Sequence, residues 1–311
     1  MKRNLFPLFF FISLFSFAQD YFAQDLIISD YVEGTLLTPN KKTKTLAIII
    51  PGSGPTDRDG NQNFAKNNSL KFLAEDLTNS GIATFRYDKR ALTMLKKGAN
   101  VKAISKVTFD DFVADAQKVV DYFNRRNRYQ NIYVIGHSQG SLVGMLASQK
   151  NVTGFISLAG AGSSIDTVIM NQLKAMGVQQ SMLDKAQKTF DILKTGEIDK
   201  EFDPNLANIF NLEVQPFMMS WIKYKPTQVI ANLNIPALIV NGDKDLQVSV
   251  DEAQLLKEAK KDNPLSLIKN MNHVLKTVET DSTQENAKTY NMQELKNNSQ
   301  LLPVLLKFIK H

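Results

Sequence analysis

A serine enclosed by two glycines is the first candidate for chemistry in this sequence. Residues 136–140 read GHSQG, with Ser138 at the centre, between the apolar run NIYVI and the helix-forming run SLVGML. A strand, a sharp turn and a helix in this order hold a serine above a sheet edge, where it can act as a nucleophile. The alternative is a serine that only caps a helix in a glycine-rich turn. The flanking segments favour the nucleophile.

A serine hydroxyl needs a general base, and histidine serves this role most often. The chain has three histidines. His137 adjoins the serine, and we expect its side chain to point away and pack beside the strand ends. His311 is the last residue. His273 lies in the loop NMNHVLK, directly after the expected strand LSLI, and is therefore the predicted base.

A carboxylate must orient this histidine and stabilise its cationic form. The loop GDKDLQV follows the expected strand IPALIVN and offers Asp243 and Asp245. Either aspartate can instead be a turn residue beside a glycine. A chain order of serine, acid and histidine is typical of nucleophiles placed on a strand–turn–helix. The chain order alone does not decide whether Asp243 or Asp245 is the carboxylate that orients His273.

The oxyanion formed during acyl transfer needs backbone N–H donors. One is expected from Gln139, the residue after the nucleophile, and the other from Ser53 in the loop PGSGPTDRDGN. Gln139 is expected to act through its backbone, so its side chain should be replaceable. The loop also resembles a phosphate nest or a calcium loop. It lacks the G-K-[ST] of a P-loop and the closing glutamate of an EF-hand, so neither reading is favoured.

The elements that must position these residues alternate along the chain. Helices are predicted over 69–81, with Ser69 as N-cap, and over 108–126, with Thr108 as N-cap. A hairpin at the sheet edge is expected over 25–39. Further strands are expected at 44–52, 82–88, 131–136, 152–160, 235–242 and 264–271. The alternation predicts an α/β fold with a mostly parallel, doubly wound sheet, which binds ligands beyond the carboxyl ends of its strands.

Residues 163 to about 231 break the alternation because most of them read as helix. We therefore expect a helical cap inserted between two strands of one domain that spans residues 20–311. Met218 and Trp221 are predicted to bind substrate in an apolar acyl pocket. The same alternatives, pocket lining or cap core, apply to Met170, Met176, Met182 and Met219.

The N-terminal segment predicts export. Lys2 and Arg3 precede an apolar run over residues 5–17, and Ser16 and Ala18 form a small-x-small cleavage pattern. This is typical of a signal peptide at residues 1–19. The alternative is an uncleaved anchor, but the run is short for a membrane span of about 20 residues. We therefore expect a periplasmic or secreted protein with no stable membrane anchor after cleavage.

Composition excludes several kinds of site. The chain has no cysteine, so it has neither disulfides nor a thiol nucleophile. Its three histidines are too dispersed for a histidine metal cluster, and no metal is expected. The formal charge of +6 comes from lysines scattered along the chain, without a basic stripe, so no nucleic-acid partner is expected.

Several longer segments carry a resemblance to a known family. They are PGSGPTDRDGN, FRYDKR, TFDDFVADA, GHSQGS, QPFMMSWIKY and NGDKDLQVSVDEA. Together they resemble the α/β-hydrolase family from about residue 30 onwards, and more narrowly its bacterial esterases and serine aminopeptidase-like members. The resemblance implies a catalytic triad of Ser138, Asp245 and His273, with Asp243 left as a turn residue. It also implies oxyanion donors at Ser53 and Gln139, ester or less often amide substrates, and no cofactor.

The sequence therefore predicts a serine hydrolase that cleaves a small-molecule acyl ester through an acyl-enzyme on Ser138. One alternative is a serine aminopeptidase of the same fold, which needs an acidic site for a free amine. Another is a binding protein on a hydrolase scaffold. The chain departs from many relatives at Pro51-Gly52, where they have His-Gly, and at ALTMLKKG, where they have a short turn of small residues. These departures affect which substrate the protein is expected to bind. The sequence does not indicate an oligomeric state.

Overall fold

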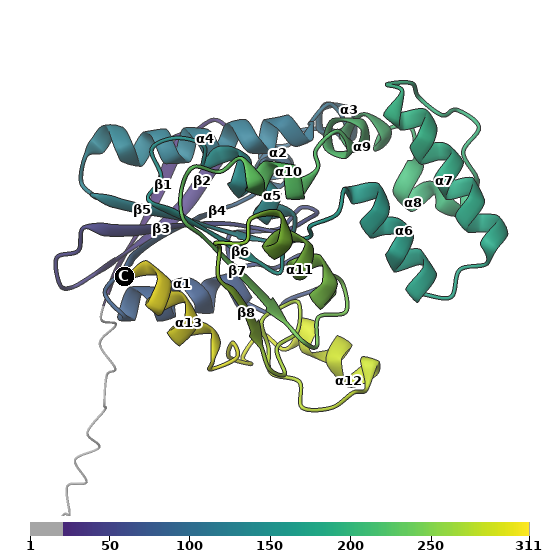
Figure 1. Ribbon diagram of the computed structural model, residues 1–311. Helices are drawn as coiled ribbons and strands as arrows, with labels where there is room; N and C mark the ends of the chain where they lie inside the picture. Colours follow the sequence, from purple (N-terminus) through teal and green to yellow (C-terminus); the bar gives the residue numbers. More distant parts are fainter. Residues whose placement is uncertain (1–20, 311) are drawn as a thin grey trace, which may run out of the picture.

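The computed structural model describes residues 21–310 of the chain, and Figure 1 shows their arrangement. The predicted signal peptide, residues 1–19, lies outside the described residues, as does His311. Within residues 21–310, no helix has both the length and the apolar character needed to cross a bilayer.

One eight-stranded sheet forms the centre of the molecule, in the order β1-β2-β4-β3-β5-β6-β7-β8. The strands are β1 (Tyr21–Ser29), β2 (Val32–Pro39), β3 (Thr45–Ile50), β4 (Ala83–Tyr87), β5 (Asn131–His137), β6 (Gly154–Leu158), β7 (Ala237–Gly242) and β8 (Leu265–Ile268). β1 and β2 form an antiparallel hairpin at one edge, and β3 to β8 run parallel. The predicted α/β fold, parallel sheet and edge hairpin are confirmed.

Helices cover both faces of the sheet, which explains why its central strands are apolar throughout. α4 (Phe109–Arg126), α5 (Gln139–Ala147), α10 (Pro226–Ala231) and α11 (Val250–Ala259) pack on one face. α1 (Ser69–Asn79) and α13 (Leu301–Ile309) pack on the other. Figure 1 shows α4 above the sheet and α1 with α13 below it.

The two predicted N-caps differ in outcome. Thr108 caps α4 in a capping box with Asp111, as its side chain accepts from the Asp111 N–H and its own N–H donates to the Asp111 carboxylate. Ser69 is not the N-cap of α1. It is the first helical residue, and Asn68 precedes it in the left-handed region at φ 54° without a side-chain cap. The carbonyl of Asp59 accepts from the N–H groups of Leu70 and Lys71 in the first turn, in place of a capping hydroxyl.

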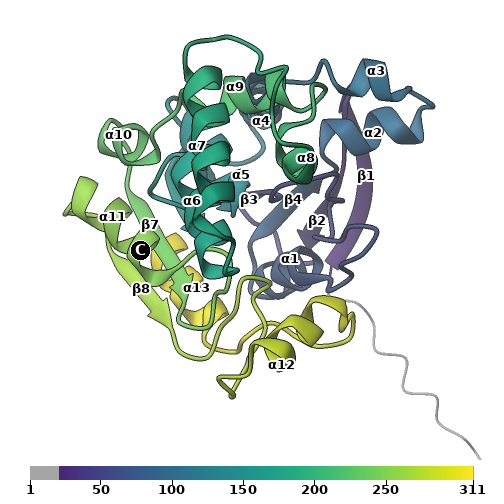
Figure 2. The same cartoon turned by 90° about the vertical axis from the view of Figure 1, so that its right-hand side faces the viewer.

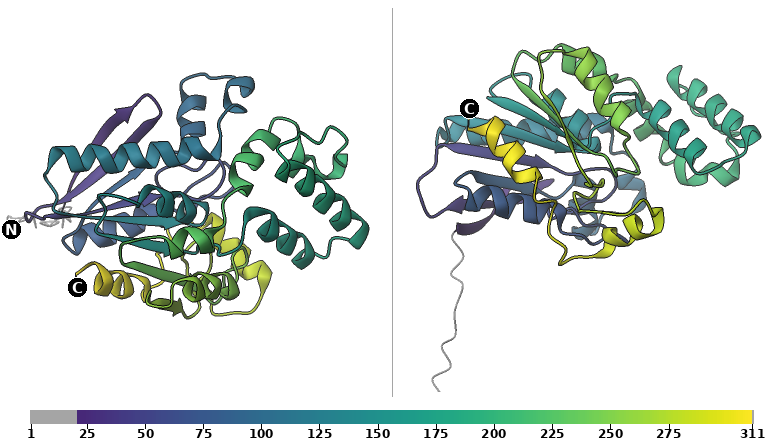
Figure 3. Two further views of the ribbon diagram at one scale, coloured as in Figure 1. Left: turned by 45° about the horizontal axis from the view of Figure 1, so that its top comes forward. Right: turned by 60° about the horizontal axis from the view of Figure 1, so that its bottom comes forward.

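The insertion between β6 and β7 is helical, and most of it projects beyond the carboxyl ends of the strands (Figures 1 and 3). Its elements are α6 (Ile165–Ala175), α7 (Gln180–Lys194), η1 (Pro204–Leu206), α8 (Ala207–Phe210) and α9 (Gln215–Ile222). They share a small core of their own, in which Phe190 and Phe210 pack edge to face. The last part of the insertion, α10, packs on the main core through Ile230. The cap proper therefore ends with α9.

Sequence periodicity did not resolve four short elements. The ALTMLKKG departure folds into α2 (Arg90–Lys96), which α3 (Val101–Ile104) follows. α12 (Thr283–Lys288) and η2 (Thr289–Asn291) lie between β8 and α13, and Figure 2 shows α12 at the bottom of the molecule. Such short helices owe their stability to tertiary contacts, because isolated helices of this length are marginal in water.

Candidate active site

Ser138 lies at the end of β5, in the sharp turn that leads to α5. Its backbone has φ 54° and ψ −123°, a strained conformation for a serine. The turn is held by a hydrogen bond of 2.9 Å from the Ser138 N–H to the Leu158 carbonyl on β6. The two flanking glycines are required, since a Cβ at Gly136 would lie 2.1 Å from the Gly140 oxygen and one at Gly140 would lie 2.4 Å from the Ile50 oxygen.

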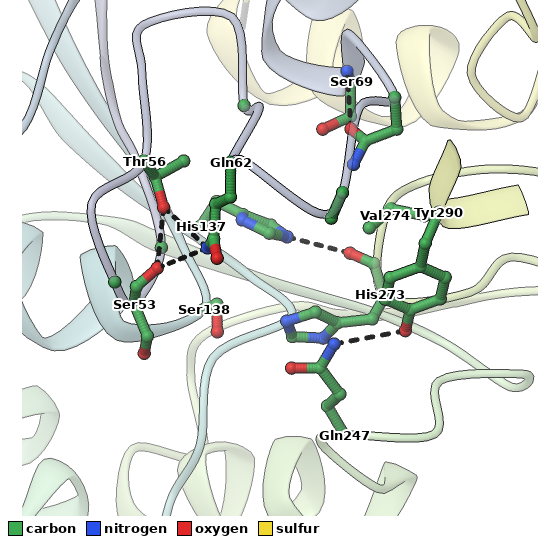
Figure 4. A pocket seen from close by; sticks show the side chains of 15 residues that line it. Ser53, Thr56, Gln62, Ser69, His137, Ser138, Gln247, His273, Val274 and Tyr290 are labelled. Carbon is green, nitrogen blue, oxygen red and sulfur yellow. Dashed lines mark hydrogen bonds between the residues drawn. The ribbon is translucent and has the colours of Figure 1, made fainter. Parts of the chain in front are cut away.

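Asp245 and His273 meet across the ends of β7 and β8. The His273 Nδ1 lies 2.8 Å from the Asp245 Oδ2, and the aspartate side chain is fully buried. The other carboxylate oxygen, Oδ1, accepts from the N–H groups of Gln247 at 2.8 Å and Val248 at 2.9 Å. With Nδ1 occupied, Nε2 is the free nitrogen of the imidazole. Figure 4 shows the His273 ring and Ser138 at the same cavity, which both residues line.

Asp243 has a separate place, as the prediction of a turn residue implied. Its Oδ1 accepts from the N–H of Asn270 at 2.6 Å, which ties the loop after β7 to the loop after β8. These are the two loops that carry Asp245 and His273. The close approach of the loops also requires Gly242, because a Cβ there would lie 1.9 Å from the Met271 oxygen.

His137 supports the neighbouring histidine. Its Nε2 lies 2.8 Å from the His273 carbonyl, which can only accept, so Nε2 carries a proton and donates. Burial lowers the pKa of His137 to about 4, assisted by the nearby His273, so the ring is neutral at physiological pH. The residue packs beside the strand ends as predicted. The sequence did not predict its hydrogen bond to the His273 backbone.

The two predicted oxyanion residues flank Ser138. Ser53 lies in the loop after β3, and Gln139 is the first residue of α5. Within residues 21–310, neither backbone N–H is paired with an acceptor of the protein. The Ser53 carbonyl is held in place by Thr56 Oγ1 at 2.6 Å and Gln62 Nε2 at 2.7 Å.

The side chain of Gln139 is not free, which corrects the expectation that it is replaceable. It is buried, and its Oε1 accepts a hydrogen bond from the Lys89 ammonium. Lys89 follows β4 and also donates to the Gly52 carbonyl at 3.0 Å. Sequence reasoning did not select Lys89, although a lysine directly after a buried parallel strand reaches the ligand-binding edge of the sheet.

Two cavities meet at Ser138. The first, here called the histidine-side cavity, has a volume of about 340 Å³. Its lining includes His273, His137, Asn67, Ser69, Gln62 and Tyr290. The second, here called the cap-side cavity, has a volume of about 310 Å³. Its lining includes Gln139, Leu142, Ile165, Val168, Ile169 and Trp221. Ser53, Ser138 and Gln247 line both.

The two residues predicted to bind substrate lie in different surroundings. Trp221 lines the cap-side cavity and stacks on Phe109 of α4, with ring centroids 5.5 Å apart. Met218 lines neither cavity, because its side chain is buried in the core of the cap. Met170, Met182 and Met219 also pack in or against that core, and Met176 is exposed. Four of the five cap methionines, all but Met176, are therefore packing residues.

The chain is similar to known hydrolases over part of its length. The family profile described as serine aminopeptidase, S33, matches residues 67–205. Esterase EstD of Thermotoga maritima is 25% identical over 240 residues, which are 76% of this chain and 56% of EstD. The match thus spans little more than half the length of EstD.

Solved structures share the fold at low identity. Est1E from Butyrivibrio proteoclasticus aligns with a TM-score of 0.56 and 19% identity, covering 93% of this chain and 99% of Est1E. The α/β hydrolase GrgF from Penicillium sp. sh18 also gives 0.56, with 17% identity, over 93% of this chain and 98% of GrgF. At such identities the likeness concerns the fold.

Proposed function

We propose that this chain, which has the α/β-hydrolase fold and resembles known hydrolases in sequence, is a serine hydrolase that cleaves carboxylic esters through an acyl-enzyme on Ser138. One observation carries the proposal. The buried pair of Asp245 and His273 leaves the imidazole Nε2 free at the cavity that the strained Ser138 also lines. A nucleophile, a base and a carboxylate that orients the base are the groups that acyl transfer requires.

In the proposed reaction, Ser138 Oγ attacks the ester carbonyl carbon while its proton moves to His273 Nε2. Asp245 stabilises the imidazolium, and the N–H groups of Ser53 and Gln139 donate to the oxyanion, each worth roughly 3 kcal/mol of barrier. The carbon–alkoxy bond then breaks, and the imidazolium returns its proton to the leaving alcohol. Water repeats the sequence and releases the acid, which regenerates the Ser138 hydroxyl.

The cavity linings favour esters over peptides. An aminopeptidase must bind the free amine of its substrate, and a carboxylate near the acyl side would provide the counter-charge. The residues that line the two cavities include no aspartate or glutamate. Asp166 at the start of α6 instead pairs with Lys194 at 2.6 Å. Ester hydrolysis is therefore the better-supported activity.

Covalent labelling tests the proposal. A fluorophosphonate probe should label the wild-type protein on the peptide that contains Ser138, and Ser138→Ala should not be labelled. Wild-type protein should hydrolyse p-nitrophenyl butyrate and leave alanine p-nitroanilide nearly untouched. Active protein that escapes labelling, or label that persists in Ser138→Ala, would contradict the mechanism. A preference for the anilide would replace esterase by aminopeptidase.

We also propose that the protein is exported and that residues 1–19 are removed. The support is the positive start, the apolar run over 5–17 and the small residues Ser16 and Ala18. N-terminal sequencing of protein recovered from the periplasm or medium of a bacterial host should begin near Gln19 or Asp20. Recovery of the full chain in the membrane fraction would instead support the anchor.

A further inference from the structure

The two cavities at Ser138 are lined by different side chains, and the reaction geometry assigns a substrate part to each. The assignment rests on the proposed function. In the tetrahedral intermediate on Ser138, the former carbonyl carbon carries the oxyanion, the leaving oxygen and the acyl chain. The leaving oxygen must lie within hydrogen-bond reach of the His273 Nε2 that protonates it. His273 lines only the histidine-side cavity, so the alcohol belongs there and the acyl chain belongs in the cap-side cavity.

The cap-side cavity is where the large apolar side chains around Ser138 gather. Leu142 of α5, Ile165, Val168 and Ile169 of α6, and Trp221 of α9 line it. Its volume of about 310 Å³ is at the lower end of the range for small-molecule sites. It therefore fits an aliphatic acyl chain of short or medium length, whose burial supplies roughly 0.8 kcal/mol per methylene.

Most side chains that line the histidine-side cavity carry a neutral polar group, and none is charged apart from its histidines. Two of its groups have no partner within residues 21–310. The Asn67 Oδ1 accepts from the Ser69 N–H at 3.0 Å, which leaves the Asn67 Nδ2 free to donate, and the Ser69 Oγ is unpaired. Both residues are only 2% exposed. Figure 4 shows Ser69 across the cavity from Ser138.

Neither the Asn67 Nδ2 nor the Ser69 Oγ is fully enclosed by protein, so each is open to the cavity, where a ligand hydroxyl can pair with it in place of water. The Tyr290 hydroxyl accepts from Gln247 Nε2 at 3.3 Å and can donate its own proton into the cavity. Its pKa is raised to about 12, first by burial, so it remains a phenol at any physiological pH. The cavity thus presents neutral donors and acceptors, which match hydroxyl groups better than a carboxylate, an amine or a hydrocarbon.

We propose that the substrate is an ester between a short or medium aliphatic acid and a neutral polyhydroxylated alcohol, such as a sugar or a polyol. The acyl chain lies under the cap, and the hydroxyl groups of the alcohol bind Asn67, Ser69 and Tyr290. This makes the histidine-side cavity a specificity site for the leaving group.

Two esters with the same acid and leaving groups of the same ring size test the proposal. They are the 6-O-butyrate of methyl glucoside and cyclohexylmethyl butyrate, both esters of primary alcohols. Wild-type protein should show a kcat/KM at least tenfold higher for the glucoside ester. Each hydrogen bond of about 1 kcal/mol contributes roughly a fivefold preference.

Ser69→Ala removes a hydroxyl that holds no structural partner. It should lower the glucoside-to-cyclohexyl ratio of kcat/KM about fivefold. Ser163→Ala, which removes a hydroxyl from the cap-side cavity, is the matched control and should keep the wild-type ratio. Equal ratios in wild type and both variants, or a preference for the cyclohexyl ester, would overturn the leaving-group assignment. If p-nitrophenyl butyrate is also not hydrolysed and Ser138 is not labelled, the proposed function itself has failed, and this proposal with it.

A second, independent observation concerns Lys89. Its side chain is buried, and its ammonium donates to the Gly52 carbonyl and to the Gln139 Oε1, while it lies 4.0 Å from the centre of the Phe112 ring. Within residues 21–310 no carboxylate pairs with it. Burial lowers the pKa of Lys89 to about 7. An unpaired buried ammonium is costly to the fold, which indicates a role beyond stability.

Both partners of the ammonium belong to the predicted oxyanion donors. The Gly52 carbonyl and the Ser53 N–H are the two ends of one planar trans peptide and point in opposite directions. Holding the carbonyl therefore aims the N–H away from Lys89. The second bond holds the side chain of Gln139, whose backbone supplies the other donor. The Lys89 ammonium thus holds both segments that carry the N–H donors, Gly52-Ser53 and Gln139.

We infer that Lys89 is a positioning residue for the oxyanion hole. It aligns the Ser53 and Gln139 N–H groups before the substrate arrives, so that both already point at the developing oxyanion. This inference rests on the proposed function, because it requires an oxyanion at Ser138. Misaligned donors weaken the transition state more than the bound ester, so the loss should appear in kcat.

Lys89→Met tests the inference with p-nitrophenyl butyrate, with fluorophosphonate labelling to count active sites. We expect kcat per labelled site to fall at least tenfold with KM within twofold, and the labelling rate to fall in parallel. The Tm of Lys89→Met should equal or exceed that of the wild type, because the variant no longer buries an ammonium group. Lys89→Gln, which keeps one N–H donor, should recover part of kcat. Lys96→Met is the control, as Lys96 pairs with Asp88 in the same segment and reaches neither donor.

An unchanged kcat per labelled site in both Lys89 variants would overturn the inference. A fall in Tm with normal kcat in the folded fraction would show that Lys89 serves the fold alone. Neither result affects the proposed function as long as Ser138 is labelled.

Discussion

Two aspartates two positions apart have separate tasks in this site. Asp245 is fully buried and faces the His273 Nδ1, whereas Asp243 accepts from the Asn270 N–H and holds two loops together. Only a carboxylate at Asp245 can both fix the imidazole tautomer and stabilise its cation. Replacing each aspartate by asparagine therefore gives a matched pair of variants.

Asp245→Asn should lower kcat for p-nitrophenyl butyrate by roughly 10³- to 10⁴-fold, because the amide favours the wrong tautomer of His273. Asp243→Asn keeps an oxygen that can accept from Asn270, so its kcat should stay within a few-fold of wild type. Steady-state kinetics on both variants, with folding checked by circular dichroism, measure the contrast. Equal losses in the two variants would remove Asp245 from the proposed triad.

Among the elements, the cap joins the catalytic domain through aromatic contacts. Trp221 of α9 stacks on Phe109 at the start of α4 and lines the cap-side cavity on its other side. Met218, one turn earlier on α9, is buried in the cap core instead. Neighbouring residues of one helix thus differ, since one lines the proposed acyl cavity and the other packs in the cap core.

Trp221→Ala should enlarge the cap-side cavity and favour longer acyl chains. The ratio of kcat/KM for p-nitrophenyl decanoate over butyrate should rise about tenfold. Met218→Ala is the control, because it should lower stability by about 2–5 kcal/mol without changing this ratio. A ratio that moves in Met218→Ala and not in Trp221→Ala would place the acyl chain elsewhere.

The capping box of α4 provides an element-scale test of the fold. Thr108→Ala removes the side chain that accepts from the Asp111 N–H and should lower the free energy of unfolding by about 1 kcal/mol in urea titrations. Ser249→Ala is the comparison, since Ser249 precedes α11 without a side-chain cap bond. The free energy of unfolding should fall less in Ser249→Ala than in Thr108→Ala. Equal losses would mean that the box contributes no more than an ordinary surface hydroxyl.

At the scale of the whole molecule, two buried lysines make stability depend on pH. Burial lowers the pKa of Lys89 to about 7, and burial together with the nearby Lys296 lowers that of Lys276 to about 8. In the unfolded chain both titrate near 10.5. Between pH 7 and 10 the unfolded state therefore binds more protons than the folded state, and stability rises with pH.

Urea unfolding at pH 7, 8 and 9 should show this rise, with a smaller slope in Lys89→Met by roughly 1 kcal/mol per pH unit. Above pH 10 the trend should reverse, because the pKa values of Tyr224 and Tyr290 are raised to about 12 in the folded protein. A wild-type slope that Lys89→Met does not change would mean that Lys89 titrates normally.

Local pattern alone determined much of this protein. The apolar runs predicted the parallel sheet, and the glycines of GHSQG with their flanking strand and helix predicted the turn at Ser138. Because parallel strands end at one edge, His273 and the aspartate loop could be placed at that edge from their order in the chain. The resemblance, rather than spacing, selected Asp245. The misplaced N-cap at Ser69 shows the limit, since a loop folded by distant contacts replaced a local signal.

Only the tertiary structure decided which side chains meet from distant segments. Met218 and Trp221 look alike in sequence as apolar residues of one helix, yet packing against separate partners gives them different tasks. The sequence places Lys89 after a buried strand, but only the fold brings its ammonium to both the Gly52 carbonyl and the Gln139 side chain. The unpaired groups of Asn67 and Ser69 also become visible only in the fold. Periodicity records which face of an element is buried, whereas these contacts depend on how whole elements pack together.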